Sequence, residues 1–377
     1  MVSSVGDSFK DQFSKHYKDA AADIGQFNLA IFGKTGAGKS TLINAIFNED
    51  VAETGIGKPV TRDEYLHIHK SGAFGLLDTR GVEIGVDTET IIKNLRRVVD
   101  ERRSKPLNER IHLAWYCVRA TDRRFEDVEA EFIKKLGDLG LPVVCVLTQV
   151  QRNSLGEYHP DALTLAKDIE ARGLPIFDSK VWMTMAKTEE FSGHPQHGLD
   201  ELLDATFRCA PDGVAKALTA VQKIDMERKR NVAIAIAGSA STAAFAAGAV
   251  PIPFSDAVLL VPIQFGMMGG IAVVYGIDVD KATIASVAAT AAATNVGKAA
   301  VVGLLKFIPG VGMLVGGAIN ATVAGGFTMV MGVAWTLVCE QLAQGGLRLV
   351  DGALDVDAIR DVFMGEFKDQ VTKRMKK

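Results

Sequence analysis

The chain has 377 residues, which exceeds one ordinary domain and predicts two or three. Its formal net charge of −3 gives no bulk basic surface, so no nucleic-acid partner is expected. The four cysteines form no CxxC motif and the polar N-terminus lacks the apolar core of a signal peptide, so we expect free thiols, a cytoplasmic location and no secretion.

An N-terminal helix is expected at about 7–22, within a segment that ends at residue 24. Its Phe9, Phe13 and Tyr17 lie at i, i+4 and i+8 and therefore share one helical face. We expect this face to pack on the C-terminal half of the chain and to tie the two ends together.

Predicted strands and helices alternate from residue 25 to about 210. The runs 27–32, 111–118 and 142–148 are mostly apolar, as buried parallel strands are, and 64–70 with 73–79 predict a hairpin. This alternation predicts an α/β fold, a doubly wound and mostly parallel sheet that binds ligands at the carboxyl ends of its strands. The other expected elements are a strand at 180–185 and helices at 39–47, 88–103, 124–137, 160–172, 198–208 and 212–229.

The stretch GKTGAGKS, residues 33–40, matches the pattern GxxxxGK[ST] between a predicted strand and a predicted helix. Its glycines let backbone N–H groups wrap a phosphate, and the start of the helix favours an anion. Lys39 is expected to reach the β- and γ-phosphates of a nucleotide. The predicted nucleotide-binding residues of this loop are Gly33, Lys34, Thr35, Gly36, Ala37, Gly38, Lys39, Ser40 and Thr41.

Residues further along the chain would complete a Mg²⁺–triphosphate site. Asp78 ends an apolar strand in DTRG (78–81), where an acidic residue can join Ser40 in the metal shell and Gly81 can contact the γ-phosphate. Thr61, in the loop 55–65, is the candidate to close over the metal; alternatively it caps a turn. The predicted metal ligands are Ser40, Thr61 and Asp78, and the predicted catalytic residues are Lys39, Thr61, Asp78 and Gly81.

The motifs GKTGAGKS, PVTRDE (59–64) and DTRG occur in an order and at a spacing that resemble the Era/TrmE branch of the translation-factor-like P-loop GTPases. The resemblance covers about 25–210. It implies a Ras-like G domain that binds GTP or GDP and hydrolyses GTP to GDP and phosphate with Mg²⁺. It also implies a low intrinsic rate, raised by a partner or by a homodimer formed through the G domains. Gly36 replaces the Asn of potassium-dependent members, so potassium activation is not expected.

The guanine-reading motif [NT]KxD of that branch is altered to TQVQ (148–151). An aspartate accepts hydrogen bonds from guanine N1–H and the amino group, whereas glutamine has one acceptor oxygen and two donors, so Gln151 satisfies only part of that edge. The next base-contacting loop corresponds to MAK (185–187). The resemblance still favours GTP, with ATP, weak selectivity or lost binding as alternatives. The residues expected at the base are Thr148, Gln149, Ala186 and Lys187.

The composition changes near residue 230, since 231–339 contain only six charged side chains. Three segments, 231–250, 257–277 and 307–339, have the ~20 uncharged residues that a bilayer span requires. The stretch 250–278 resembles the signature of the YcjF-type domain of unknown function, which follows such G domains in a group of bacterial proteins. That resemblance implies an all-α domain over 211–377, with a linker helix at about 211–230 and membrane association.

Two interpretations of 231–339 remain open. In one, this region and the basic C-terminus KRMKK (373–377) contact lipids at the inner face of the cell membrane, under control of the nucleotide state. In the other, it is a soluble bundle of small-residue helices. The functional alternatives to a GTPase are a non-hydrolysing nucleotide-gated scaffold and a dynamin-like membrane-remodelling protein. The C-terminal helix is expected to bury one face, made of Val356, Ile359, Phe363 and Phe367.

Overall fold

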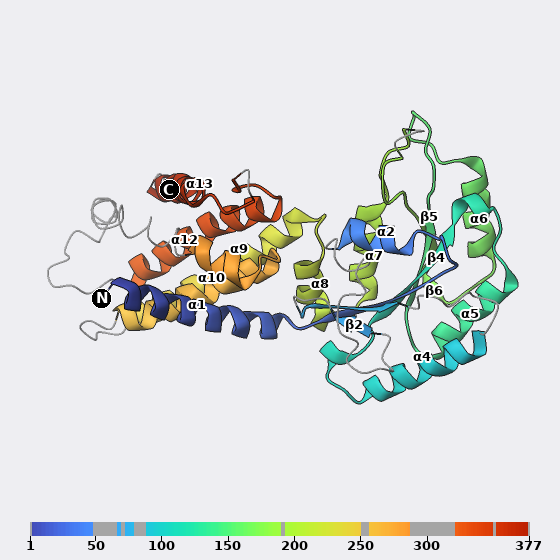
Figure 1. Cartoon of the computed structure of the whole chain (residues 1–377), viewed down its shortest axis with the longest axis horizontal. Coiled ribbons are helices and arrows are strands. Elements are labelled where there is room, and N and C mark those ends of the chain that lie inside the picture. The colour runs from blue at the N-terminus through green and yellow to red at the C-terminus, as the bar shows by residue number, and fades with distance from the viewer. Residues whose placement is uncertain are drawn as a thin grey trace. The chain divides into compact units, whose positions relative to one another are not determined.

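The computed structural model describes residues 2–47, 66–68, 72–78, 88–189, 193–249, 256–286, 321–349 and 352–375 (Figure 1). The chain forms two compact units. One consists of residues 25–225. The other joins residues 1–24 to residues 226–377, so both ends of the chain belong to the same unit.

A six-stranded sheet forms the centre of the unit 25–225, in the order β2-β3-β1-β4-β5-β6. Among the described strands, β2 pairs antiparallel with β3 and every other neighbouring pair is parallel. The predicted α/β sheet and its antiparallel hairpin are therefore confirmed. The strands are β1 (Phe27–Phe32), β2 (Leu66–Ile68), β3 (Phe74–Asp78), β4 (Leu113–Arg119), β5 (Val143–Thr148) and β6 (Ile176–Met183).

Helices cover both faces of this sheet. One face shares a hydrophobic cluster with α4 (Thr88–Arg103), α5 (Asp127–Asp138) and α6 (Pro160–Ala171). The other face contacts α7 (Leu199–Cys209) and α8 (Ala215–Val221), and α2 (Lys39–Ile46) packs on α7. Central strands buried from both sides read as continuous apolar sequence, which is why β1, β4 and β5 could be recognised.

The single helix predicted over 212–229 is wrong. The chain forms a short 3₁₀ turn at Asp212–Val214, then α8, and α9 (Met226–Gly248) begins after a break. At the break, the Gln222 side chain accepts from the backbone N–H groups of Ile224 and Asp225, at 2.8 and 2.7 Å. Lys223 N–H donates to the carbonyl of Ile46 at 2.9 Å. These bonds keep residues 211–225 in the sheet-containing unit, so the expected boundary at 210/211 lies at 225/226.

The second unit is helical. It contains α1 (Val2–Ile24), α9, α10 (Asp256–Val274), α12 (Ala321–Ala343) and α13 (Val356–Met375), and residues 279–286 are also helical. Helix α12 packs on α9, α10 and α13, while α1 packs on α10. This confirms the predicted all-α character of the C-terminal region. Of the segment 307–339, residues 307–320 lie outside the described residues.

Aromatic side chains fix the two terminal helices. Phe13 of α1 is buried against Phe265 with their ring centroids 6.1 Å apart, and Tyr17 OH donates to the Ile277 carbonyl at 2.7 Å. Phe9 has no described side chain. In α13 the residues Ile359, Phe363 and Phe367 are buried as predicted, but Val356 is 39% exposed. Val356 is the first residue of the helix, where its side chain lies beyond the packed face.

Candidate nucleotide site

The phosphate loop connects the end of β1 to the start of α2. Gly36 and Gly38 have φ values of 81° and 78°, a left-handed conformation that side-chain-bearing residues rarely adopt. A Cβ at Gly33 would lie 2.2 Å from the carbonyl oxygen of Cys117 on β4. The Lys39 ammonium donates to the carbonyls of Gly33 and Lys34, at 2.7 and 3.0 Å. The phosphate loop therefore surrounds the Lys39 ammonium group with its own backbone carbonyls.

The loop after β5 is hydrogen-bonded to the phosphate loop. Thr148 is buried, and its hydroxyl donates to the Ala37 carbonyl at 2.7 Å and lies 3.2 Å from the Val118 carbonyl. The Gln149 Nε2 donates to the Gly36 carbonyl at 3.1 Å. Thr148 and Gln149 were expected to contact the base, but both are hydrogen-bonded to the phosphate loop. Their bonds hold the loop after β5 next to the phosphate loop.

Lys34 is held by the start of α5. Its ammonium lies 2.9 Å from the Glu126 carboxylate and 3.0 Å from the Glu129 carboxylate. Those two glutamates form the capping box of α5, and Glu129 is buried. Burial alone would lower the pKa of Lys34, but the bonds to the two carboxylates outweigh it and raise the pKa. The Lys34 side chain therefore fixes the loop through two carboxylates that the sequence motifs did not predict as its partners.

Two of the residues expected to hold Mg²⁺ lie on neighbouring elements of the fold. Ser40 lies exposed in the first turn of α2. Asp78 ends β3 in register with Ile31, one residue before the end of β1. A hydroxyl and a carboxylate are hard oxygen donors of the kind that Mg²⁺ prefers, so this donor set fits the metal. The Asp78 side chain, and all of Thr61 and Gly81, lie outside the described residues.

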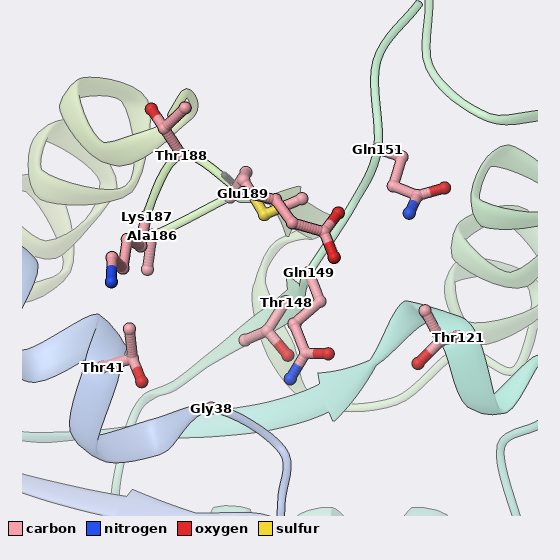
Figure 2. A pocket seen from close by; sticks show the side chains of 11 residues that line it. Gly38, Thr41, Thr121, Thr148, Gln149, Gln151, Ala186, Lys187, Thr188 and Glu189 are labelled. Carbon is pink, nitrogen blue, oxygen red and sulfur yellow. The ribbon is translucent and has the colours of Figure 1, made fainter. Parts of the chain in front are cut away.

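A pocket of about 420 Å³ opens beside the phosphate loop, within the size range of small-ligand sites (Figure 2). Four segments line it: the end of the phosphate loop with the start of α2, the short 3₁₀ turn after β4, the loop after β5 and the loop after β6. The predicted residues Gly38, Thr41, Thr148, Gln149, Ala186 and Lys187 are all among its lining residues, so the structure brings them together. Met185 of the MAK loop and Gln151 of TQVQ also line the pocket, together with Thr121, Thr188 and Glu189, which the sequence motifs did not predict.

Hydrogen bonds hold the two sides of the segment after β6 together. The backbones of Met185 and His197 exchange two hydrogen bonds of 3.0 Å, and Gln196 Nε2 donates to the Ala186 carbonyl at 2.7 Å. The His197 Nε2 lies 2.8 Å from the Val150 carbonyl, and the His194 Nδ1 lies 2.9 Å from the Arg152 carbonyl. Both imidazoles therefore connect this segment to the loop after β5.

The chain has a glycine-rich loop between a strand and a helix, this sheet order, and a pocket at the ends of neighbouring strands. These features give residues 25–225 the P-loop GTPase fold. Residues 28–149 match the family model described as "50S ribosome-binding GTPase". Among curated proteins, the chain is 24% identical to neuronal-specific septin-3 of Rattus norvegicus over 179 residues, which are 41% of this chain and 50% of that protein. It is also 24% identical over 180 residues to cell division control protein 11 of Saccharomyces cerevisiae, covering 40% of this chain and 43% of that protein.

The chain thus spans about half the length of the curated relatives that it matches. A solved structure of a probable GTP-binding protein, engB, overlaps 48% of this chain and 97% of its own, at 14% identity and a TM-score of 0.33.

Proposed function

We propose that the G domain binds GTP and GDP and hydrolyses GTP to GDP and phosphate with Mg²⁺. The observation that carries this proposal is the phosphate loop, whose glycine conformations and enclosed Lys39 ammonium suit a triphosphate. Lys39 would bind the β- and γ-phosphates once they replace the loop carbonyls as its partners. Thr148 and Gln149 would hold the loop in its bound form through their existing hydrogen bonds.

Ser40 and Asp78 would hold the metal, and we propose Thr61 as a third ligand and Gly81 as a γ-phosphate contact. When bound, Mg²⁺ neutralises charge on the β- and γ-phosphates. The residues of this chain position the triphosphate, because phosphoryl transfer depends mostly on orientation and electrostatic stabilisation. We also propose that pairing of two G domains raises the rate, so turnover per molecule should increase with protein concentration.

Phosphate release from GTP tests the hydrolysis. Ser40→Ala should lower Mg²⁺-dependent turnover by about tenfold or more, since it removes one metal ligand. Ser154→Ala, an exposed serine in the loop after β5, is the matched control and should leave turnover unchanged. Equal Mg²⁺ dependence in both variants would contradict the metal assignment. GTP binding without turnover, at high protein concentration and with liposomes, would support a nucleotide-gated scaffold instead.

We propose further that the G domain belongs to the Era/TrmE branch and the helical unit to the YcjF type. The motifs at 33–40, 59–64 and 78–81 support the first assignment, and the stretch 250–278 supports the second.

For the helical unit we propose association with the inner face of the cell membrane. Helices α9 and α12 have the length and apolar composition of membrane-crossing helices, but a core helix of a soluble bundle has them too. They differ in burial, because 67% of the apolar stretch of α12 is buried and only 22% of that of α9. Phe245 of α9 is 50% exposed. An apolar helix with so little of its surface buried supports contact with lipid.

Liposome flotation tests this association. The wild-type protein should float with liposomes containing anionic lipid, and Phe245→Asp should float less because it places a charge on the exposed face of α9. Leu155→Asp is the control, since Leu155 is 81% exposed in the G domain. Wild-type protein that stays wholly in the bottom fraction, with and without nucleotide, would contradict the proposal. Nucleotide-dependent oligomers that reshape the liposomes would support a membrane-remodelling protein.

A further inference from the structure

The TQVQ segment (148–151), which corresponds to the guanine-reading motif, has no carboxylate to read a guanine base. Guanine presents two adjacent donors there, N1–H and the amino group, whereas adenine presents an acceptor at N1. Selection of guanine therefore needs acceptor atoms that carry no competing donor, as a carboxylate does. Gln151 has one amide oxygen and an amide group that donates. It cannot select guanine by itself.

The pocket has a carboxylate from another loop. Glu189 is the one acidic residue among the described residues that line the pocket, and Gln149 and Gln151 line the same pocket. In Figure 2 the Glu189 carboxylate is directed from the loop after β6 toward the side of the pocket where Gln149 and Gln151 lie. The pocket therefore contains a carboxylate, which TQVQ lacks, on the loop after β6.

The backbone at Glu189 is fixed. Its N–H donates to the His194 carbonyl at 3.0 Å, and its carbonyl accepts from Gly193 N–H at 2.8 Å. His194 in turn lies 2.9 Å from the Arg152 carbonyl through Nδ1, and Arg152 follows Gln151 directly. These hydrogen bonds fix the backbone from which the Glu189 side chain extends. Specific recognition of a ligand requires side chains held in position in this manner.

The side-chain amide of Gln149 is hydrogen-bonded to the phosphate loop. Its Nε2 donates to the Gly36 carbonyl of the phosphate loop, and its backbone has a left-handed φ of 56°. Gln151 and Glu189 line the same pocket, and each carries side-chain oxygen that can accept hydrogen bonds from a base.

We propose that Glu189 is the guanine-specificity residue of this G domain. Its carboxylate accepts from guanine N1–H and from the amino group, and it faces the N1 lone pair of adenine unfavourably. Gln151 assists with its single amide oxygen. This inference rests on the proposed binding of guanine nucleotides and adds the residue that selects the base.

Calorimetric titration of the full chain with GDP, ADP and xanthosine diphosphate tests the inference. Glu189→Gln should weaken GDP binding by about tenfold or more, because one of two acceptor atoms becomes a donor. It should strengthen xanthosine diphosphate binding, since xanthine has a carbonyl where guanine has its amino group and the new amide can donate to it. Glu131→Gln, at a largely exposed carboxylate on α5, is the matched control and should behave as wild type.

A second variant separates base reading from a folding defect. Adding Gln151→Asp to Glu189→Gln returns a carboxylate to the pocket and should restore the preference for GDP. The role of Glu189 would be overturned if Glu189→Gln bound GDP, ADP and xanthosine diphosphate with the same relative affinities as the wild type. It would also be overturned if Glu189→Gln lost GDP binding and Gln151→Asp did not restore it. Neither result would overturn the proposed binding of guanine nucleotides. A wild-type protein that binds no guanine nucleotide would overturn the proposed function as well.

Discussion

The hydroxyl of Thr148 donates a 2.7 Å hydrogen bond to the carbonyl of Ala37 and so joins the end of β5 to the phosphate loop. The same oxygen lies 3.2 Å from the carbonyl of Val118, near the end of β4. Thr148 is only 3% exposed, so these bonds are shielded from water. The loop expected at the base and the loop expected at the phosphates therefore share a buried contact.

Thr148→Val should lower the unfolding free energy by about 1–2 kcal/mol, because it leaves the Ala37 carbonyl buried without this donor. It should also weaken nucleotide binding, since the phosphate loop loses a support. Thr164→Val on α6 is the control, because its exposed hydroxyl bonds only locally to the Pro160 carbonyl. Chemical denaturation and calorimetry measure both effects. Equal behaviour of the two variants would show that the contact has no such role.

His112 should make the G domain less stable in mild acid. Its Nδ1 accepts from Asn28 N–H at 2.8 Å and its Nε2 donates to the Leu107 carbonyl at 2.8 Å, so the ring is held neutral. Burial lowers the pKa of His112 in the folded protein, outweighing the backbone hydrogen bonds that raise it. The unfolded chain therefore binds more protons once the pH falls below ~6.5, and the unfolding free energy decreases from there toward the lower folded pKa.

His112→Gln removes this titration. The difference in unfolding free energy between about pH 7.5 and about pH 5.5 should be smaller in the variant than in the wild type. Denaturant titrations at both pH values measure it. The same difference in both proteins would mean that other groups cause the pH dependence.

The helical unit offers two glycines whose substitution should have opposite effects. A Cβ at Gly332 of α12 would lie 2.5 Å from the Ala237 Cβ and 2.8 Å from the Met267 sulfur. Gly332→Ala should therefore lower the unfolding free energy by about 1–3 kcal/mol. A Cβ at Gly238 of α9 would meet no described atom within 4 Å.

Gly238→Ala should consequently raise the unfolding free energy by up to ~1 kcal/mol, because alanine favours the helix. Thermal unfolding followed by circular dichroism compares the two variants. A shift of the same sign in both would contradict the close packing of α9 and α12 at Gly332.

The parts of the fold that depend on local pattern could be predicted from the sequence. Buried strands such as β5 are continuous apolar runs, and the phosphate loop has a motif that glycine geometry explains. The break at Gln222 could not be predicted, because a glutamine side chain makes the turn and the sequence has no glycine or proline there. Strand β6 begins at Ile176, earlier than predicted, and its pairing with β5 is irregular because Asp178 and Ser179 adopt left-handed conformations within it.

Roles within the site were harder to predict because they depend on distant partners. Lys34 pairs with the carboxylates of Glu126 and Glu129, which lie about a quarter of the chain further along the sequence. Thr148 reaches the phosphate loop across 111 positions. The motif spacing predicts that such residues gather at one edge of the sheet, but it does not say which atoms meet. Glu189 could have been suspected as a carboxylate three residues after Ala186.

We propose that residues 33–40 bind the phosphates of a guanine nucleotide. Calorimetric titration of the full chain with GTP and Mg²⁺ measures this binding, using wild type, Lys39→Ala and the exposed control Lys134→Ala on α5. The wild type and the control should bind GTP, and Lys39→Ala should lose binding by about tenfold or more, since it removes the charge enclosed by the loop. Undiminished GTP binding by Lys39→Ala would contradict the site.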